Sequence, residues 1–438
     1  MTTTVDELQN KVALQKTQLP GMYGTVDFGL RPERFTDDPD AETAMRSELA
    51  HQRPRLLADK NQVATIEAFT MLGDSVADAY AALFPQLGFR KIVDMLEQAC
   101  TNGIDSVSDA PPELVALIED MERVPDWIDM ELVEKGARLE RNTSAHAAPY
   151  AIRGGFVATF MNTYAALPMA LTGGLDKKSA GQRIKETAVF FAGSTLPGAL
   201  DRYGVGFKAA AKVRLVHSMV RYHVLSRGQW DSAVYGIPIP QSDQMPAGLL
   251  GIFRLSLGLL RSGREEFTPD ERARVEFVLY RTHLLGLPKE LLPDTPRRIV
   301  DVMATRHATL RKAYDDDTCG ALLRATMDAY MEPDTSIRSR VRDRFEKSFS
   351  KGFFIRSYFA GDNDRAKQVG IDFTRADKFR ANCVGLIIGA QMAIYHRLLQ
   401  VPATARAADA RLVKKLNRDL SRLGHAEFTT DATHYRHV

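Results

Sequence analysis

Three side chains that could bind and support a metal cofactor stand together in the segment GVGFKAAAKVRLVHSMVRYHVLSRG, residues 204–228. The segment contains no proline and begins and ends at glycines, so we predict a helix. Arg214, His217 and Arg221 are spaced by three and four residues and therefore project from one side of that helix. A neutral imidazole nitrogen can bind the iron of a haem, while guanidinium groups pair with the haem propionates. The pattern suits a haem ligand, but it also suits a hydrogen-bonded core histidine.

A second array stands upstream in GQRIKETAVFF, residues 181–191. Arg183, Thr187 and Phe190 lie on one stripe of a helix. A cation and a hydroxyl beside an aromatic wall suit the distal side of a haem, where bound oxygen needs a hydrogen-bond donor. An ordinary amphipathic helix with a solvated first turn gives the same pattern. We predict that His223, near the opposite face of the downstream helix, is not part of the set.

Competing chemical motifs are excluded by their context. Gly204-Val-Gly206 begins a loose dinucleotide-binding fingerprint, but no apolar strand precedes it. A carboxylate-bridged di-iron bundle needs two Glu-x-x-His helices, and only Glu48-Leu-Ala-His51 occurs. The sequence contains no phosphate loop, nucleophile elbow or His-Glu-x-x-His motif.

The composition is that of a folded globular protein. The chain has 438 residues, of which 45% are hydrophobic and 26% charged. Its 58 basic and 55 acidic residues nearly balance, without a run of five like charges, so we expect no nucleic-acid partner. Three scattered cysteines fit neither a disulfide framework nor a cysteine-based metal site.

Targeting signals are also absent from the sequence pattern. The first residues, MTTTVDELQNK, have neither the basic nor the apolar region of an export signal, so we expect a cytoplasmic protein. The longest apolar run, Cys383 to Tyr395, is shorter than the roughly 20 residues that a spanning helix needs. We therefore predict no transmembrane segment.

The elements that must position these side chains are predicted to be helices. Alternating strand patterns are almost absent, and the fold class is expected to be all-α. Residues 1–60 are turn-rich and predicted to form an irregular N-terminal arm, residues 61–402 a single helical haem-binding domain, and residues 403–438 a polar, loosely held C-terminal tail. Apolar residues recur at helical spacing in the stretches 62–84, 88–100, 111–121, 128–140, 152–170, 180–192, 207–226, 246–261, 268–285, 295–331, 335–349 and 376–399.

The order of these motifs carries a family resemblance. Arg183-x-x-x-Thr187 followed by Arg214-Leu-Val-His217-x-x-x-Arg221 resembles the signature of the latex-clearing and MpaB-type oxygenases. Two later segments resemble the same family: WDSAVYGIPIPQSDQM at 230–245, with Gln241 and Asp243 in place, and HLLGLPKELLPDTP at 283–296. The resemblance covers roughly residues 150–330.

The resemblance implies a globin-like helical haem-binding core with additional surrounding helices and one non-covalent haem b. By position, His217 becomes the proximal iron ligand, and Arg183 and Thr187 become residues of the haem pocket. Arg214 and Arg221 become either partners of the propionates or residues that support the pocket from behind.

The chain departs from the family in ways that bear on the substrate. Latex-clearing members are usually exported and use a glutamate about four turns before the pocket arginine, but here the only acid between Met161 and Gly181 is Asp176. Some relatives place a lysine before the pocket threonine, where this chain has Glu186. Glu186 is a candidate catalytic acid or base, or it points to solvent. Rubber cleavage is therefore not carried over.

These observations predict a haem-b-dependent oxygenase. Its partners would be dioxygen, an electron donor for the haem, and a small apolar substrate that is isoprenoid or resembles an unsaturated lipid. The main alternative is a haem protein without turnover, such as a gas or redox sensor or a haem carrier. A purely structural helical protein, with His217 in its core, is a third hypothesis.

Overall fold

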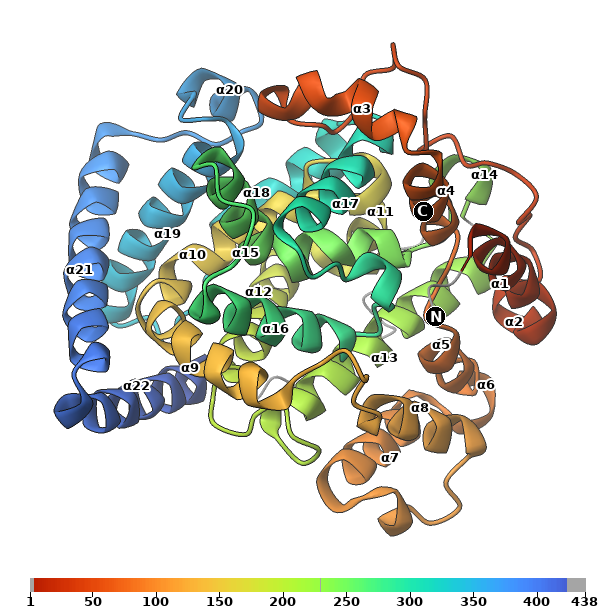
Figure 1. Ribbon diagram of the computed structural model, residues 1–438, viewed down its shortest axis with the longest axis horizontal. Helices are drawn as coiled ribbons and strands as arrows, with labels where there is room; N and C mark the ends of the chain where they lie inside the picture. Colours follow the sequence, from red (N-terminus) through yellow and green to blue (C-terminus); the bar gives the residue numbers. More distant parts are fainter. Residues whose placement is uncertain (1–3, 229, 424–438) are drawn as a thin grey trace. The chain divides into compact units, whose positions relative to one another are not determined.

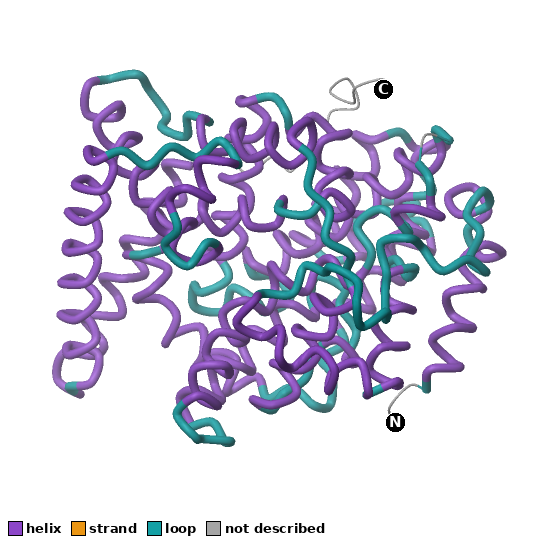
Figure 2. Tube along the Cα trace, turned by 90° about the horizontal axis from the view of Figure 1, so that it is seen from above, coloured by secondary structure: helices purple, strands orange, loops and turns teal. Residues whose placement is uncertain are grey.

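The computed structural model describes residues 4–228 and 230–423, which fold into helices joined by loops (Figure 1). Within these ranges no β-strand occurs, as Figure 2 shows. Extended backbone pairs only at isolated bridges, where Phe35 meets Leu310 and Thr43 meets Arg311. The predicted all-α class is confirmed.

The chain divides into two compact units that alternate along the sequence. Among the described residues, unit 1 comprises those up to Gly136 together with Phe207–Ala313. Unit 2 comprises Ala137–Gly206 together with the residues from Tyr314 onward. Helix α9 (Met130–His146) crosses the first boundary. The single haem-binding domain expected for residues 61–402 stays a prediction.

Unit 1 is built around α15, which packs against α4, α16 and α17. Around this centre, α1 packs on α4, and α5 packs on α8. The α-helices of unit 1 are α1 (Val5–Gln18), α2 (Pro20–Tyr23), α3 (Arg53–Ala58), α4 (Lys60–Thr70), α5 (Ser75–Ala81), α6 (Phe84–Leu87), α7 (Phe89–Asn102), α8 (Pro112–Glu122), α13 (Val205–Ser226), α14 (Ser232–Tyr235), α15 (Gln241–Arg261), α16 (Pro269–His283) and α17 (Pro296–Thr309).

Unit 2 is built around α10 and α19, which pack against each other. Helix α21 packs along α19 and contacts α22, while α12 contacts α10, α18 and α22 (Figure 1). The α-helices of unit 2 are α10 (Ala148–Val157), α11 (Thr163–Met169), α12 (Lys177–Gly193), α18 (Ala321–Asp328), α19 (Ile337–Tyr358), α20 (Asn363–Gln368), α21 (Arg375–Gln400) and α22 (Pro402–Leu423).

The two ends of the chain contain helices that the sequence reading did not expect. Helix α1 has 14 residues, a capping box formed by Thr4 and Glu7, and a buried Leu8 on the side that packs on α4. The prediction of an arm without long helices is wrong here, because Pro20 and Gly21 follow the helix instead of interrupting it.

Helix α22 occupies most of the predicted tail. Ala408, Leu412 and Leu416 are buried at four-residue spacing, so this polar helix still has one apolar side that packs into unit 2. The prediction of a loosely held segment is therefore wrong for residues 403–423. Residues 424–438 lie outside the described part of the chain.

Some predicted long helices are interrupted. The stretch 62–84 contains α4 and α5, separated at residues 71–74, where Asp74 caps α5 by accepting a hydrogen bond from the Ala77 amide. The stretch 152–170 likewise divides into α10 and α11, and 295–331 into α17 and α18. The first of these breaks matters most, because it places carboxylates beside α13.

Candidate active site

Helix α13 carries the predicted ligand near its middle. Its start requires glycine, since a Cβ atom on Gly204 would lie 2.3 Å from the carbonyl oxygen of Ala199. The Gly206 amide donates to that same oxygen at 2.7 Å. Three consecutive alanines follow, and the helix runs unbroken to Ser226 before Gly228 takes a φ of +66°. The predicted helix of residues 207–226 is confirmed.

His217 is half-buried and makes one side-chain hydrogen bond with the residues that the structure describes. Its Nδ1 lies 3.3 Å from Oε1 of Gln244 on α15. Burial, together with the positive charge of Arg221, lowers the pKa of His217 to about 4, so the ring is neutral near pH 7. With Nδ1 donating to Gln244, the lone pair lies on Nε2, which is the arrangement found in histidines that bind metals.

The partner of His217 is itself held in place. Gln244 Nε2 lies 3.4 Å from Gln241 Oε1, and Gln241 Nε2 donates to the Gly73 carbonyl at 3.2 Å. The Gln241 amide donates to the Leu72 carbonyl at 3.0 Å, and Gln15 accepts from the Gly73 amide at 2.9 Å. This network joins α15, α1 and the break between α4 and α5, and so fixes the orientation of the histidine.

Arg214 forms a two-pronged ion pair with Asp74. Its Nε and Nη2 donate to the two carboxylate oxygens at 2.7 and 2.9 Å, and its Nη1 donates to Asp120 at 2.8 Å. Burial alone would raise the pKa of Asp74, but the Arg214 guanidinium outweighs it and the pKa is lowered. Gly286, with a φ of +88°, packs on the pair: a Cβ atom there would lie 2.4 Å from Asp74 Oδ2.

Arg221 forms the second buried pair, with Asp78. Its Nη2 lies 2.7 Å from Asp78 Oδ1, and neither side chain is exposed. The guanidinium also donates to the Ile239 carbonyl and to Ser218 Oγ, while the Tyr23 hydroxyl donates to Asp78 Oδ2 at 2.6 Å. Both arginines of α13 therefore already have carboxylate partners within unit 1. This arrangement favours the supporting role over the pairing with propionates.

Asp243, singled out by the family resemblance, has a similar place at the start of α15. Arg34 and Arg306 both donate to its Oδ1, at 2.6 and 2.8 Å, and all three side chains are buried. These contacts bind α15, which carries Gln244, to α17 and to the N-terminal segment.

The sequence analysis missed Asp74, Asp78 and Gln244. Gly73-Asp74-Ser75 is a turn followed by a helix cap, a signal that would have located the first of them.

On α12 in unit 2, Arg183 is half-buried and holds a kinked segment. It donates to Thr172 Oγ1 at 3.1 Å, to the Thr172 carbonyl and to the sulfur of Met169. The backbone leaves the helical region at Thr172 and Gly173, whose φ is +84°. Arg183 thus fixes the turn between α11 and α12, unlike a solvated surface arginine.

Glu186 and Thr187 are also half-buried on α12. Gln182 Nε2 donates to Glu186 Oε1 at 3.1 Å, whereas the Thr187 hydroxyl makes no side-chain hydrogen bond within residues 4–228 and 230–423. Asp176 accepts a hydrogen bond from the Ser179 amide and caps α12. The α13 residues Arg214, His217 and Arg221 are brought together in unit 1, and the α12 residues belong to unit 2.

The donor set suits a cofactor that needs one protein ligand. In the part of the chain that the structure describes, no cluster of three or more histidine, cysteine, aspartate or glutamate side chains could hold a metal ion. A neutral histidine whose Nδ1 donates a hydrogen bond fits the proximal ligand of a haem.

Across the same residues, every helix is too short or too polar to span a membrane.

Comparisons with known proteins show a likeness to oxygenases. Residues 143–356 match the family described as "ER-bound oxygenase mpaB/B'/Rubber oxygenase, catalytic domain". A rubber oxygenase of Streptomyces sp. (strain K30) is 27% identical over 191 residues, which cover 42% of this chain and 46%, about half, of that protein. The structure of latex clearing protein LCP in the closed state shares the fold with a TM-score of 0.56 and 21% identity, over 81% of this chain and 91% of that one. Over residues 143–356 the chain is therefore similar to the catalytic domain of the MpaB-type and rubber oxygenases.

Proposed function

We propose that this protein is a haem-b-dependent oxygenase that acts with dioxygen on an apolar substrate. The family consists of oxygenases, and His217 supplies the observation that carries the cofactor. It is a neutral, half-buried imidazole whose Nδ1 faces an amide oxygen and whose Nε2 makes no hydrogen bond with a described residue. When bound, the haem supplies the activation of dioxygen, which protein side chains alone do not provide.

The side chains of unit 1 keep His217 in one tautomer, one protonation state and one orientation. His217 would hold the iron through Nε2, and Gln244 accepts a hydrogen bond from Nδ1–H, which fixes the tautomer and the ring plane. The positive charge of Arg221 disfavours a second proton on the ring. Arg214 and Arg221, through Asp74 and Asp78, hold α13 so that the imidazole cannot rotate with its helix.

The side chains of α12 are proposed to act on the substrate side of the reaction. The family resemblance gives Arg183 and Thr187 a place in the haem pocket. Arg183 already donates to Thr172 in the turn before α12, so it would shape the pocket. The Thr187 hydroxyl would donate a hydrogen bond to dioxygen in the pocket. Glu186 would move a proton in place of the family's glutamate. The apolar stretch Tyr164–Leu171 favours a substrate that is isoprenoid or resembles an unsaturated lipid. An electron donor would reduce the haem.

Two measurements test the proposal in sequence. An absorption band typical of haem on the purified protein excludes a purely structural role, and its absence after haem supplementation overturns the proposal. The reduced protein is then incubated with short polyisoprenoids or unsaturated lipids under isotopically labelled dioxygen. An oxygenase is supported if the wild type forms a carbonyl product that contains labelled oxygen and His217→Ala does not. Full haem content without any labelled product favours a sensor or carrier instead.

A further inference from the structure

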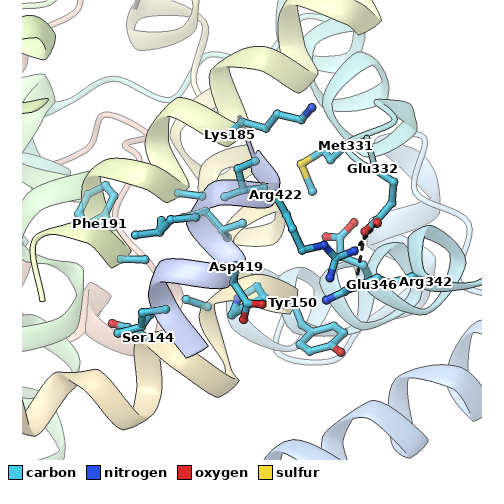
Figure 3. A pocket seen from close by; sticks show the side chains of 18 of the residues that line it. Ser144, Tyr150, Lys185, Phe191, Met331, Glu332, Arg342, Glu346, Asp419 and Arg422 are labelled. Atoms are coloured by element: carbon cyan, nitrogen blue, oxygen red, sulfur yellow. Dashed lines mark hydrogen bonds and ion pairs between the residues drawn. The ribbon is translucent and has the colours of Figure 1, made fainter. Parts of the chain in front are cut away.

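A pocket within unit 2 lies on the side of α12 away from the Arg183–Thr187 stripe. Lys185 and Ala192 line it and, at about 100° per residue, project roughly opposite to Arg183 and Thr187, while Ala188 and Phe191 line it from the flanks of the helix. The other walls come from α9, α10, α19, α22 and residues 331–333 (Figure 3). The pocket is therefore separate from the stripe that the oxygenase proposal uses.

The pocket has an apolar part and a charged part. Figure 3 shows the ring of Phe191 on one side and the charged group of Glu332, Arg342 and Arg422 on the other. A cavity of this kind suits a molecule with a hydrocarbon chain and a polar head. The apolar lining includes Ala148, Ile152, Phe191, Met331, Leu416 and Leu420.

Most of the acids that line the pocket are already neutralised from outside it. Four acids and three cations contribute to the lining. Three of the acids pair with cations that do not line the pocket: Asp343 with Lys347 at 2.9 Å, Glu346 with Arg153 at 2.7 Å, and Asp419 with Lys415 at 2.6 Å.

The cations that line the pocket are not neutralised to the same extent. Glu332 is shared between Arg422, at 3.1 Å, and Arg342, at 3.6 Å. Lys185 is half-buried and forms no ion pair or hydrogen bond with a residue in the described ranges. Two arginines thus share one carboxylate, and Lys185 lines the same pocket without an ion pair to a described residue, which favours an anion in the pocket.

We propose that this pocket binds a long-chain carboxylate. Its acyl chain lies along the wall of Phe191, Ala188 and Leu420, and its carboxylate is held by Lys185 and Arg422. Charge-assisted hydrogen bonds to the head give selectivity, and burial of the chain gives affinity. The site binds a ligand apart from the oxygenase chemistry and goes beyond that proposed function.

Calorimetric titration of the full-length protein with decanoate tests the head group. Decanoate is expected to bind at least about tenfold more tightly than decan-1-ol or decyltrimethylammonium, because only the carboxylate meets the surplus cations. Equal binding of the three compounds, or no binding of decanoate, would overturn the proposal.

Substitutions in and outside the pocket test where decanoate binds. Lys185→Gln and Arg422→Gln should each weaken decanoate binding about tenfold, whereas Lys178→Gln, exposed on the same helix, should leave it unchanged. Ala188→Phe fills the apolar part and should abolish binding while circular dichroism shows an intact helical fold. His217→Ala should bind decanoate like the wild type, whatever the fate of the oxygenase proposal. Loss of decanoate binding in His217→Ala would place the ligand at the haem and refute this site.

Discussion

Helices α13 and α12 carry similar types of polar residue, but these residues differ in burial and in ion pairing. On α13, Arg214 and Arg221 are buried, and each is paired with a carboxylate. On α12, the polar side chains are only half-buried, and Lys185 has no ion-pair partner among the described residues. The comparison separates groups that fix the proposed ligand, His217, from groups that remain available to bind another molecule.

The difference has a physical reason. Burying a charge costs several kcal/mol unless a partner compensates it, so the arginines of α13 persist only because Asp74 and Asp78 accompany them. What they contribute is a single orientation of α13 and a neutral His217. Half-buried groups on α12 keep much of their hydration and can exchange water for a ligand at lower cost.

The largest effect is expected at His217, the proposed iron ligand. His217→Ala should give a folded protein that retains little or no haem, because the proposed protein bond to iron is removed. Absorbance per protein and circular dichroism measure the two properties. His223→Ala is the control, since His223 packs edge-on against the ring of Phe84 at 4.7 Å, and it should keep normal haem content. An unchanged spectrum in His217→Ala would assign the iron to another residue.

The buried pair on α13 should dominate stability. Asp78→Asn leaves Arg221 charged and without its anion, and should lower the free energy of unfolding by about 3–5 kcal/mol. Urea titration of the protein without haem measures this change. In the exposed pair of Asp316 with Arg324, Asp316→Asn should cost less than about 1 kcal/mol. Similar costs for the two variants would contradict the contrast between buried and exposed pairs.

Gln244 should act as a positioning residue. Gln244→Leu removes the acceptor for His217 Nδ1 and should weaken haem binding roughly 10–100-fold. Gln244→Glu keeps an acceptor and should restore most of the affinity. The iron–histidine stretching frequency, measured by resonance Raman spectroscopy, should move in opposite directions in the two variants. An unchanged frequency in both variants would mean that Gln244 contributes packing but does not influence His217.

The neutral state of His217 predicts a pH dependence. Its folded pKa of about 4 lies below the ordinary value of 6.5, so between these values the unfolded chain binds more protons. The stability contribution of the neutral ring is therefore complete above about pH 6.5 and is lost as the pH falls toward 4. His217→Ala should show a smaller loss of unfolding free energy than the wild type across this window. Parallel pH profiles would show that His217 titrates normally.

Smaller effects are expected on α12. Thr187→Ala should keep haem content and lower turnover roughly fivefold, since one hydrogen bond of about 1 kcal/mol is removed. Glu186→Gln should also keep the haem but lower turnover, because an amide cannot take up or release the proton that Glu186 is proposed to move. Product formation across a pH series measures both variants. Unchanged turnover in Glu186→Gln would leave this side chain a structural role, such as its contact to Gln182.

The sequence predicted the helices that carry the site better than the contacts that hold it. Uninterrupted apolar spacing without proline located α12 and α13, and the order of motifs led to the proposal that His217 is the ligand. The ends of the chain were harder to predict. Helix α22 buries only the side that bears Leu412 and Leu416, so its high content of charged residues masked a regular apolar stripe.

The partners of the site could not be predicted, because they depend on contacts between distant segments. Asp74 follows a break in what the periodicity presents as one helix, and nothing in the local sequence shows that Arg214 will meet it. Gln244 lies in a segment that the resemblance singled out, yet an amide has no distinctive spacing. Only the packing of α15 brings it to His217.

The buried pairs on α13 also constrain how the protein is made. Asp74 precedes Arg214 by 140 residues, and Asp78 precedes Arg221 by 143. During synthesis these carboxylates leave the ribosome long before their arginines and remain hydrated, so the pairs form only after α13 has emerged. The segment around Gly286, which covers one of the pairs, arrives later still. Capture of the cofactor is therefore expected to be a late step of folding, and a peptide of α13 alone would not reproduce the ligand site.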